Sequence, residues 1–210
     1  MKTLQSANGL PDHGHGGLGR VAHGALTSLS GIEDGPKLFL GYNTLPNPPF
    51  PLVGYLQNDL GPEAAALDPA SLLRAAAGSM RAHPVPPKEA FAEGHRRVAA
   101  VMRVDAMVFV VSARAFAPQQ SPSARALWAN LVEGYYRDGD AEACVDARET
   151  ALALGVDRQD GRVLLVAERG PSGGYAAPVR VEGKPKGELF DLLGEVLDAQ
   201  YVWTKAAFAL

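Results

Sequence analysis

Two runs of apolar residues carry the strongest strand signals in the chain. Residues 104–116 (VDAMVFVVSARAF) include Met107–Val111, which is apolar at odd and even positions alike. Successive side chains of a strand point to opposite faces, so this run predicts a central strand covered on both sides. Residues 163–168 (VLLVAE) predict a second strand in the same sheet, near the first. Residues 175–182 (YAAPVRVE) predict a hairpin partner for it, placed at a sheet edge because Pro178 lacks a ladder donor.

Helical signals fill most of the remaining chain after residue 61. Asp68 is a predicted N-cap with Pro69 in the first turn, and His83 and Pro84 end that helix. Apolar positions at helical spacing predict further helices over residues 87–103, 123–137, 141–154 and 188–208. The last of these is apolar around most of its circumference. Such a helix must pack on the sheet or on a neighbouring subunit.

The first 61 residues differ in composition from the rest, holding 11 of the 23 glycines and 6 of the 16 prolines. Glycine raises the backbone entropy of the unfolded chain and proline removes hydrogen-bond donors, so residues 1–61 predict a long, irregular, extended arm. A short strand is expected within it at residues 37–42. Residues 62–210 predict a single α/β (α+β) domain. We expect a small mixed or antiparallel sheet in it, flanked by four to five helices.

Composition and charge exclude several classes of protein. The 210 residues are 47% hydrophobic and 20% charged, which is typical of a globular protein. A formal net charge of −3 gives no electrostatic reason to expect nucleic acid or an anionic membrane as partner. The single cysteine, Cys144, forms no intramolecular disulfide and is expected to be a small buried residue. Without a secretory signal or a run of 18 apolar residues, we expect a cytoplasmic protein or one inside a cytoplasmically assembled particle.

A histidine- and glycine-rich segment, residues 12–23, is the main candidate for chemistry. His13, His15 and His23 could supply imidazoles to a metal. Glycines around these residues oppose the rigid placement that a metal site needs, so we predict that neither a metal nor a cofactor binds there tightly. Residues 14–19 also match G-x-G-x-x-G, but the phosphate-binding motif requires a preceding strand that these residues lack. The remaining interpretation is a flexible or partner-ordered loop with solvated histidines.

The chain lacks a nucleophile elbow, a C-x-x-C pair, an H-E-x-x-H helix and a P-loop, which favours association over catalysis. The leading hypothesis is a non-enzymatic binding or structural protein, such as a component of a virion or other large assembly. Its partners would be copies of itself or other protein subunits. The expected contact residues are aromatic side chains of the arm, each contributing about 1.5–3 kcal/mol on burial: Phe39, Tyr42, Phe50 and Tyr55.

The alternative hypothesis is a small cytoplasmic enzyme whose site lies where residues 12–23 meet the sheet. No catalytic residue can be assigned from the sequence. Convergence of these histidines with an acid in a concave pocket would favour the enzyme. Contact between the arm and another chain would favour the assembly component.

Overall fold

The computed structural model describes residues 4–6, 16–27, 35–44, 54–58, 60, 67–87, 90, 102–115, 121–133, 139–170 and 174–208. Within these residues, seven antiparallel strands form one sheet in the order β1-β3-β2-β4-β5-β6-β7. The strands are β1 (Leu4–Ser6), β2 (Lys37–Thr44), β3 (Gly54–Asn58), β4 (Met102–Ala115), β5 (Arg148–Asp157), β6 (Arg162–Glu168) and β7 (Val179–Arg180). The expected α+β fold with an antiparallel sheet is therefore confirmed.

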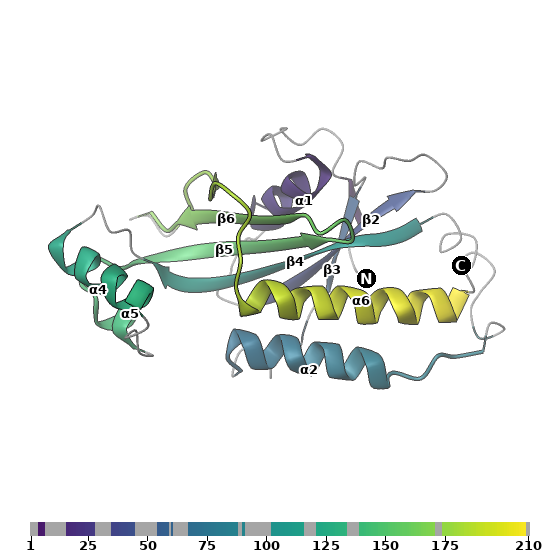
Figure 1. Cartoon of the computed structure of the whole chain (residues 1–210). Helices are drawn as coiled ribbons and strands as arrows, with labels where there is room; N and C mark the ends of the chain where they lie inside the picture. The colour runs from purple at the N-terminus through teal and green to yellow at the C-terminus, as the bar shows by residue number, and fades with distance from the viewer. Residues whose placement is uncertain are drawn as a thin grey trace.

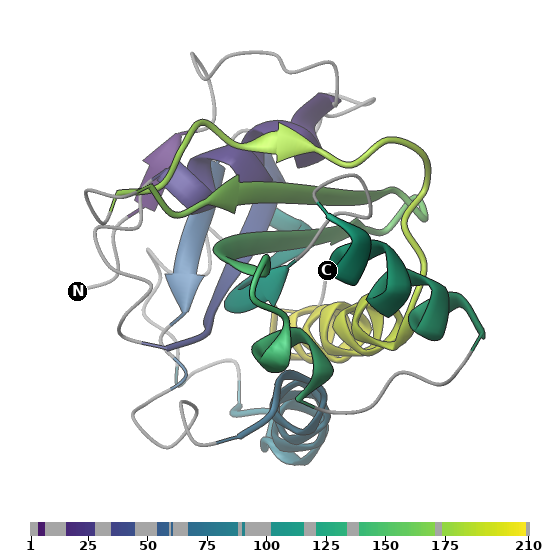
Figure 2. The same cartoon turned by 90° about the vertical axis from the view of Figure 1, so that its left-hand side faces the viewer.

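Helices cover both faces of this sheet (Figure 1). Helix α1 (Gly16–Thr27) lies on one face, and α6 (Glu188–Phe208) lies on the other, against β4 and β5. Helix α2 (Pro69–Ala82) packs on the side of α6 that is turned away from the sheet. Two further helices, α4 (Pro122–Glu133) and α5 (Asp140–Ala143), lie where β4 and β5 extend beyond the rest of the sheet (Figure 2).

The central strand is β4, as its apolar run predicts. Even-numbered residues such as Val108 pack with α1, whereas odd-numbered residues such as Phe109 belong to the cluster under α6. Strand β5 separates β4 from β6, so the two predicted apolar strands are near neighbours in one sheet. The predicted pairing with β6 and the position of β7 at the end of the strand order are also confirmed, but β7 comprises only Val179–Arg180 of the predicted residues 175–182. Cys144 is buried, as expected.

The helix pair α2 and α6 matches the sequence prediction closely. Helix α6 spans the predicted residues and buries Leu193, Val196 and Leu197 against the sheet and α2. Two ion pairs join the helices, Arg74 with Glu188 and Arg81 with Glu195. Their partners are seven residues apart in each helix, so α2 and α6 run parallel. Within the described part of the chain, no helix combines the length and apolar character that crossing a bilayer requires.

Asp68→Ala is expected to lower the unfolding temperature, because the Asp68 carboxylate caps α2 by accepting a hydrogen bond from the Ser71 backbone N–H at 2.9 Å. Hydrogen bonds from the Ser71 side chain and backbone hold the pKa of Asp68 below its ordinary 3.8. A depressed pKa contributes stability above the unfolded-state value, and this contribution is lost as the pH falls through the folded-state value. The difference from wild type should therefore be largest near neutral pH and shrink below about pH 4.

Thermal unfolding followed by circular dichroism between pH 3 and pH 7 measures this difference. Ser79→Ala, at an exposed position of the same helix, is the control and should show no such pH dependence. An equal loss for Asp68→Ala at both ends of the pH range would contradict the capping role.

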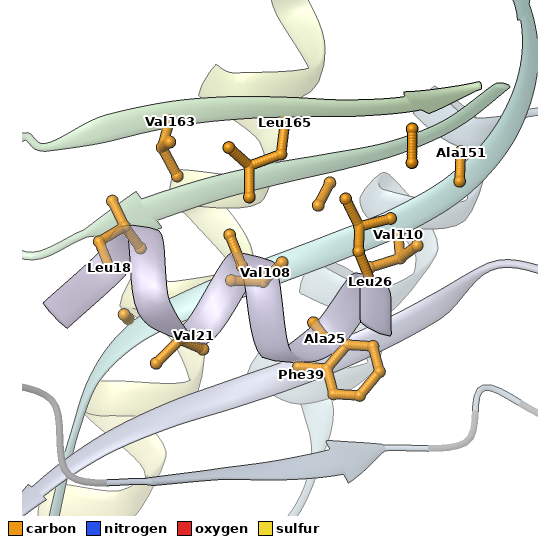
Figure 3. Packing of buried hydrophobic residues seen from close by; sticks show 14 residues of the cluster. Leu18, Val21, Ala25, Leu26, Phe39, Val108, Val110, Ala151, Val163 and Leu165 are labelled. Atoms are coloured by element: carbon orange, nitrogen blue, oxygen red, sulfur yellow. The ribbon is translucent and has the colours of Figure 1, made fainter. Parts of the chain in front are cut away.

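The structure corrects the expected organisation of residues 1–61 where it describes them. Residues 16–27 are helical, and β2 lies between β3 and β4 in the main sheet. Phe39 of β2 is 0% exposed and packs beneath α1 (Figure 3). Strands from both sides of residue 61 thus share one sheet. Residue 61 is therefore not a boundary between an arm and the domain. Residues 45–53, which include the proline-rich stretch, lie outside the described residues.

Two predicted helices differ from the structure or fall largely outside the described residues. Residues 141–154 were expected to be helical, but only α5 is, and the chain then enters β5. Strand β5 pairs with β4 on one side and β6 on the other, and these two ladders override the helix propensity of its alanines. The helix predicted over residues 87–103 falls largely outside the described residues, and its last two positions belong to β4.

Candidate functional site

A cavity of about 710 Å³ lies between α1 and the β6–β7 edge of the sheet. This volume falls within the range of roughly 300–1,000 Å³ that is typical of small-molecule sites. Four parts of the chain line the cavity: α1, β6, β7 with the preceding proline, and the loop over residues 182–184. Residues more than 130 positions apart in the sequence therefore meet at one site.

Helix α1 contributes His23 to the cavity. The apolar face of α1 packs onto the sheet through Leu18, Val21 and Ala25, which are spaced for one helical face. His23 lies on the flank of this face and is half-buried, with its Nδ1 atom shielded from solvent. The packing of α1 on the sheet thus holds the imidazole at the cavity wall.

The sheet edge contributes Arg180. Its Cα is paired with that of Leu165, and directly opposed residues of antiparallel strands place their side chains on the same face. Leu165 belongs to the core beneath α1, so Arg180 lies on the face that α1 covers. The Arg180 side chain is half-buried, and its Nε atom is shielded from solvent. A guanidinium in this setting interacts more strongly with an anion than one in open water.

Two more cations, Arg162 and Lys184, lie at the end of the cavity near the β5–β6 turn. Arg162 Nη2 donates a hydrogen bond of 2.9 Å to Asp191 Oδ1, and its Nε lies 4.0 Å from Asp160 Oδ1. Lys184 forms an ion pair with the same Asp160. The hydrogen bond and charge of Lys184, with a smaller contribution from Arg162, hold the pKa of Asp160 below its ordinary value. Asp160 therefore stays ionised at neutral pH and links the two cations.

The β5–β6 turn that presents Asp160 is held by the side chain of Asp157. Its Oδ1 accepts hydrogen bonds from the backbone N–H groups of Gln159, at 2.8 Å, and Gly161, at 2.7 Å. Asp160 adopts a φ of 61°, in the left-handed region that aspartate tolerates better than most residues. The position of the acid between the two cations thus follows from local turn geometry.

The lining combines positive charge with apolar surface. Three cations and one acid, Glu182, line the cavity of a chain whose formal net charge is −3. Leu165, Pro178 and Val179 supply the apolar part. Such a site can hold an anion, because guanidinium and ammonium groups donate charge-assisted hydrogen bonds to carboxylate and phosphate.

The structure separates the predicted histidines. His13 and His15 lie outside the described residues, whereas His23 lines the cavity that Glu182 also lines. Among the described residues, no three histidine, cysteine, aspartate or glutamate side chains cluster closely enough to hold a metal ion. The expectation that His13, His15 and His23 bind no metal stays a prediction.

The aromatic residues expected to bind a partner lie elsewhere. Phe39 and Tyr42 are buried within the domain, and burial raises the pKa of Tyr42. The folded protein therefore does not present these two side chains to a partner, which corrects the prediction. Phe50 lies outside the described residues, and for Tyr55 only the backbone, in β3, is described.

Sequence reasoning did not single out the cavity cations. The available signal was the alternation of charged residues at positions 180, 182, 184 and 186, next to a predicted edge strand. No pattern in the sequence indicated that α1 would lie close to this edge of the sheet. No family model matches the chain, and comparisons with curated proteins and with solved structures found no match.

Proposed function

We propose that this protein is a non-enzymatic binding protein that holds a small anionic molecule in the cavity between α1 and β7. The observation that carries the proposal is that Arg180 and Lys184 line one cavity of ligand size, with Arg162, whose guanidinium is held by Asp191 of α6, at its β6 end. These cations come from β6, β7 and the following loop, so the fold itself assembles them. The chain as a whole has a negative formal net charge, so the positive charge gathered at this site is opposite in sign to that of the whole protein.

Association with protein subunits was expected from aromatic residues of the arm. Phe39 and Tyr42 give that expectation no support, because both belong to the core. A binding function centred on the cavity needs neither side chain. Protein partners therefore stay a prediction from the sequence, separate from the present proposal.

An enzyme is the second candidate, because His23 and Glu182 line the same cavity. A histidine and a carboxylate are the usual groups of general acid–base catalysis. Recovery of a bound ligand unchanged after long incubation supports the binding protein. Conversion of that ligand, abolished by His23→Gln, would support the enzyme.

Lys184→Met is expected to weaken anion binding about tenfold, because a charge-assisted hydrogen bond contributes roughly 1.5–3 kcal/mol and Lys184 is partly solvated. The probe is inorganic phosphate, titrated into ¹⁵N-labelled protein and followed by NMR. Amide shifts should cluster at the cavity wall, around Gly183 and His23. The apparent dissociation constant then follows from the same titration.

Lys186→Met is the matched control, since Lys186 is an exposed lysine two residues along the same loop that does not line the cavity. It removes the same charge and should change the affinity by less than twofold. Equal weakening by both variants, or shifts scattered over all surface lysines, would show non-specific charge attraction and contradict the proposed site.

A further inference from the structure

We infer that a groove beside the last turns of α6, here called the α6 groove, binds a small organic cation that carries an aromatic ring. The groove lies between α6 and the end of α2, on the opposite side of the sheet from α1. It is thus separate from the cavity between α1 and β7. Its volume of about 330 Å³ is at the lower end of the range for small-molecule sites. At roughly 30 Å³ per water molecule, it has room for a ligand of about ten non-hydrogen atoms.

The α6 groove exists because α2 ends before α6 does. Arg81, in the last turn of α2, pairs with Glu195, and α6 continues for about 20 Å past Glu195 at roughly 1.5 Å per residue. Beyond α2, residues 83–85 are not helical and fill less space beside α6 than another turn of helix would (Figure 1). Ala199 and Ala206 line the groove from α6, seven residues apart on one helical face. Their small side chains leave the hollow open.

The walls of the α6 groove are apolar and include an aromatic ring that neighbouring groups hold in place. The half-buried Trp203 donates a hydrogen bond of 3.4 Å from its Nε1 to the Pro84 carbonyl oxygen. Its ring centroid also lies 5.6 Å from that of His83. Val202, from α6, is 66% exposed, and Val85, from the chain beyond α2, is 46% exposed. An aromatic ring bound in the groove would remove this apolar surface from water.

The charges that line the α6 groove favour a cation over an anion. Arg81 donates a hydrogen bond of 2.9 Å to Glu195, which neutralises its charge. Asp198 is exposed and forms no ion pair within the part of the chain that the structure describes. Asp198 and Val202 are four residues apart on α6 and are therefore neighbours on its surface. An ammonium group beside Asp198 would leave its aromatic ring to cover Val202 and reach Trp203.

The test is an NMR titration of the full ¹⁵N-labelled chain at pH 8, where histidine is normally neutral. The probe is 2-phenylethylammonium, compared with 2-phenylethanol, which lacks the charge, and with ethylammonium, which lacks the ring. The indole N–H resonance of Trp203, assigned with Trp203→Phe, should shift on binding. That of Trp128, in α4 at the opposite end of the molecule, should not.

The aromatic cation should bind about fivefold more tightly than the alcohol, which corresponds to the upper end of the effect of an exposed ion pair. It should bind at least tenfold more tightly than ethylammonium, because the ring covers apolar surface. Equal affinity for the cation and the alcohol would contradict the role of Asp198. Equal affinity for the two cations would contradict the role of the apolar walls. Either result would overturn the inference.

Asp198→Asn should reduce the preference for the cation over the alcohol to less than twofold, because the amide keeps the size of the carboxylate without its charge. Glu188→Gln is the matched control, since it removes the same charge from an exposed position at the other end of α6 and does not line the groove. It should leave the preference unchanged. A preference that survives Asp198→Asn, or a Trp203 resonance that does not shift, would overturn the inference. A Trp203 resonance that shifts when the free protein is diluted would show that a second copy covers the groove, and would overturn it too.

Discussion

Phe39→Ala is expected to lower the free energy of unfolding by about 3–5 kcal/mol, a large part of the roughly 5–15 kcal/mol that stabilises a typical domain. The Phe39 side chain is 0% exposed, lies in β2 between two other strands, and contacts the core beneath α1. Its removal would leave a void that the two packed layers cannot close. Urea denaturation measures the loss.

Val202→Ala provides the control for this prediction, because it removes an exposed apolar group and should change stability by no more than about 0.5 kcal/mol. Measurements at several protein concentrations separate unfolding from any dissociation of subunits. A Phe39→Ala variant that unfolds like the wild type but assembles less well would contradict the place of Phe39 in the core. It would also restore the hypothesis that residues 1–61 act by association.

Gly155→Ala is expected to destabilise the protein by about 1–3 kcal/mol, which is the usual effect of adding atoms to a packed core. A Cβ at this position would lie 2.7 Å from Val163 Cγ1 and 3.1 Å from Leu18 Cδ1. Both neighbours belong to the interface between α1 and the sheet, so relief requires the side chains of Val163 and Leu18 to shift, and with Leu18 the seating of α1 on the sheet. Because α1 also carries His23, we expect the affinity of the cavity for anions to fall as well.

Gly78→Ala is the matched control for Gly155→Ala. Gly78 lies in α2 with nothing within 4 Å of an added Cβ, so alanine should stabilise the helix by about 0.5–1 kcal/mol. The same substitution is thus predicted to act in opposite directions at the two positions. Chemical denaturation measures both variants. A stabilising effect at Gly155 would show that α1 does not approach the sheet as closely as described.

The strands and helices with strong periodicity could be predicted from the sequence. The apolar run of β4, the α2 boundaries at Asp68 and His83, and the 21 residues of α6 all follow from local signals. Each of these patterns reports burial or capping that is decided within the element itself. Such features can be predicted without knowing the structure of the rest of the chain.

Helix α1 and strand β5 could not be predicted, and the reason is the same for both. Gly17, Gly19 and Gly24 of α1, and Ala151 and Ala153 of β5, argue against the structures that these segments adopt. The small β5 residues lie in the core beneath α1, where they allow the helix to approach the sheet. Close packing between distant segments thus determined both elements. The cavity depends on that same approach and was missed for this reason.

Helix α6 follows in the chain every described element that it packs against, namely α2, β4 and β5. During synthesis the strands of the described sheet are therefore all made before α6, the helix that covers one face of that sheet. Met107, Phe109 and Leu154 on that face remain exposed until α6 has left the ribosome. Unprotected apolar surface of this kind attracts chaperones and promotes aggregation. Slow translation near the codons for α6 should then prolong this exposure and lower the yield of soluble protein.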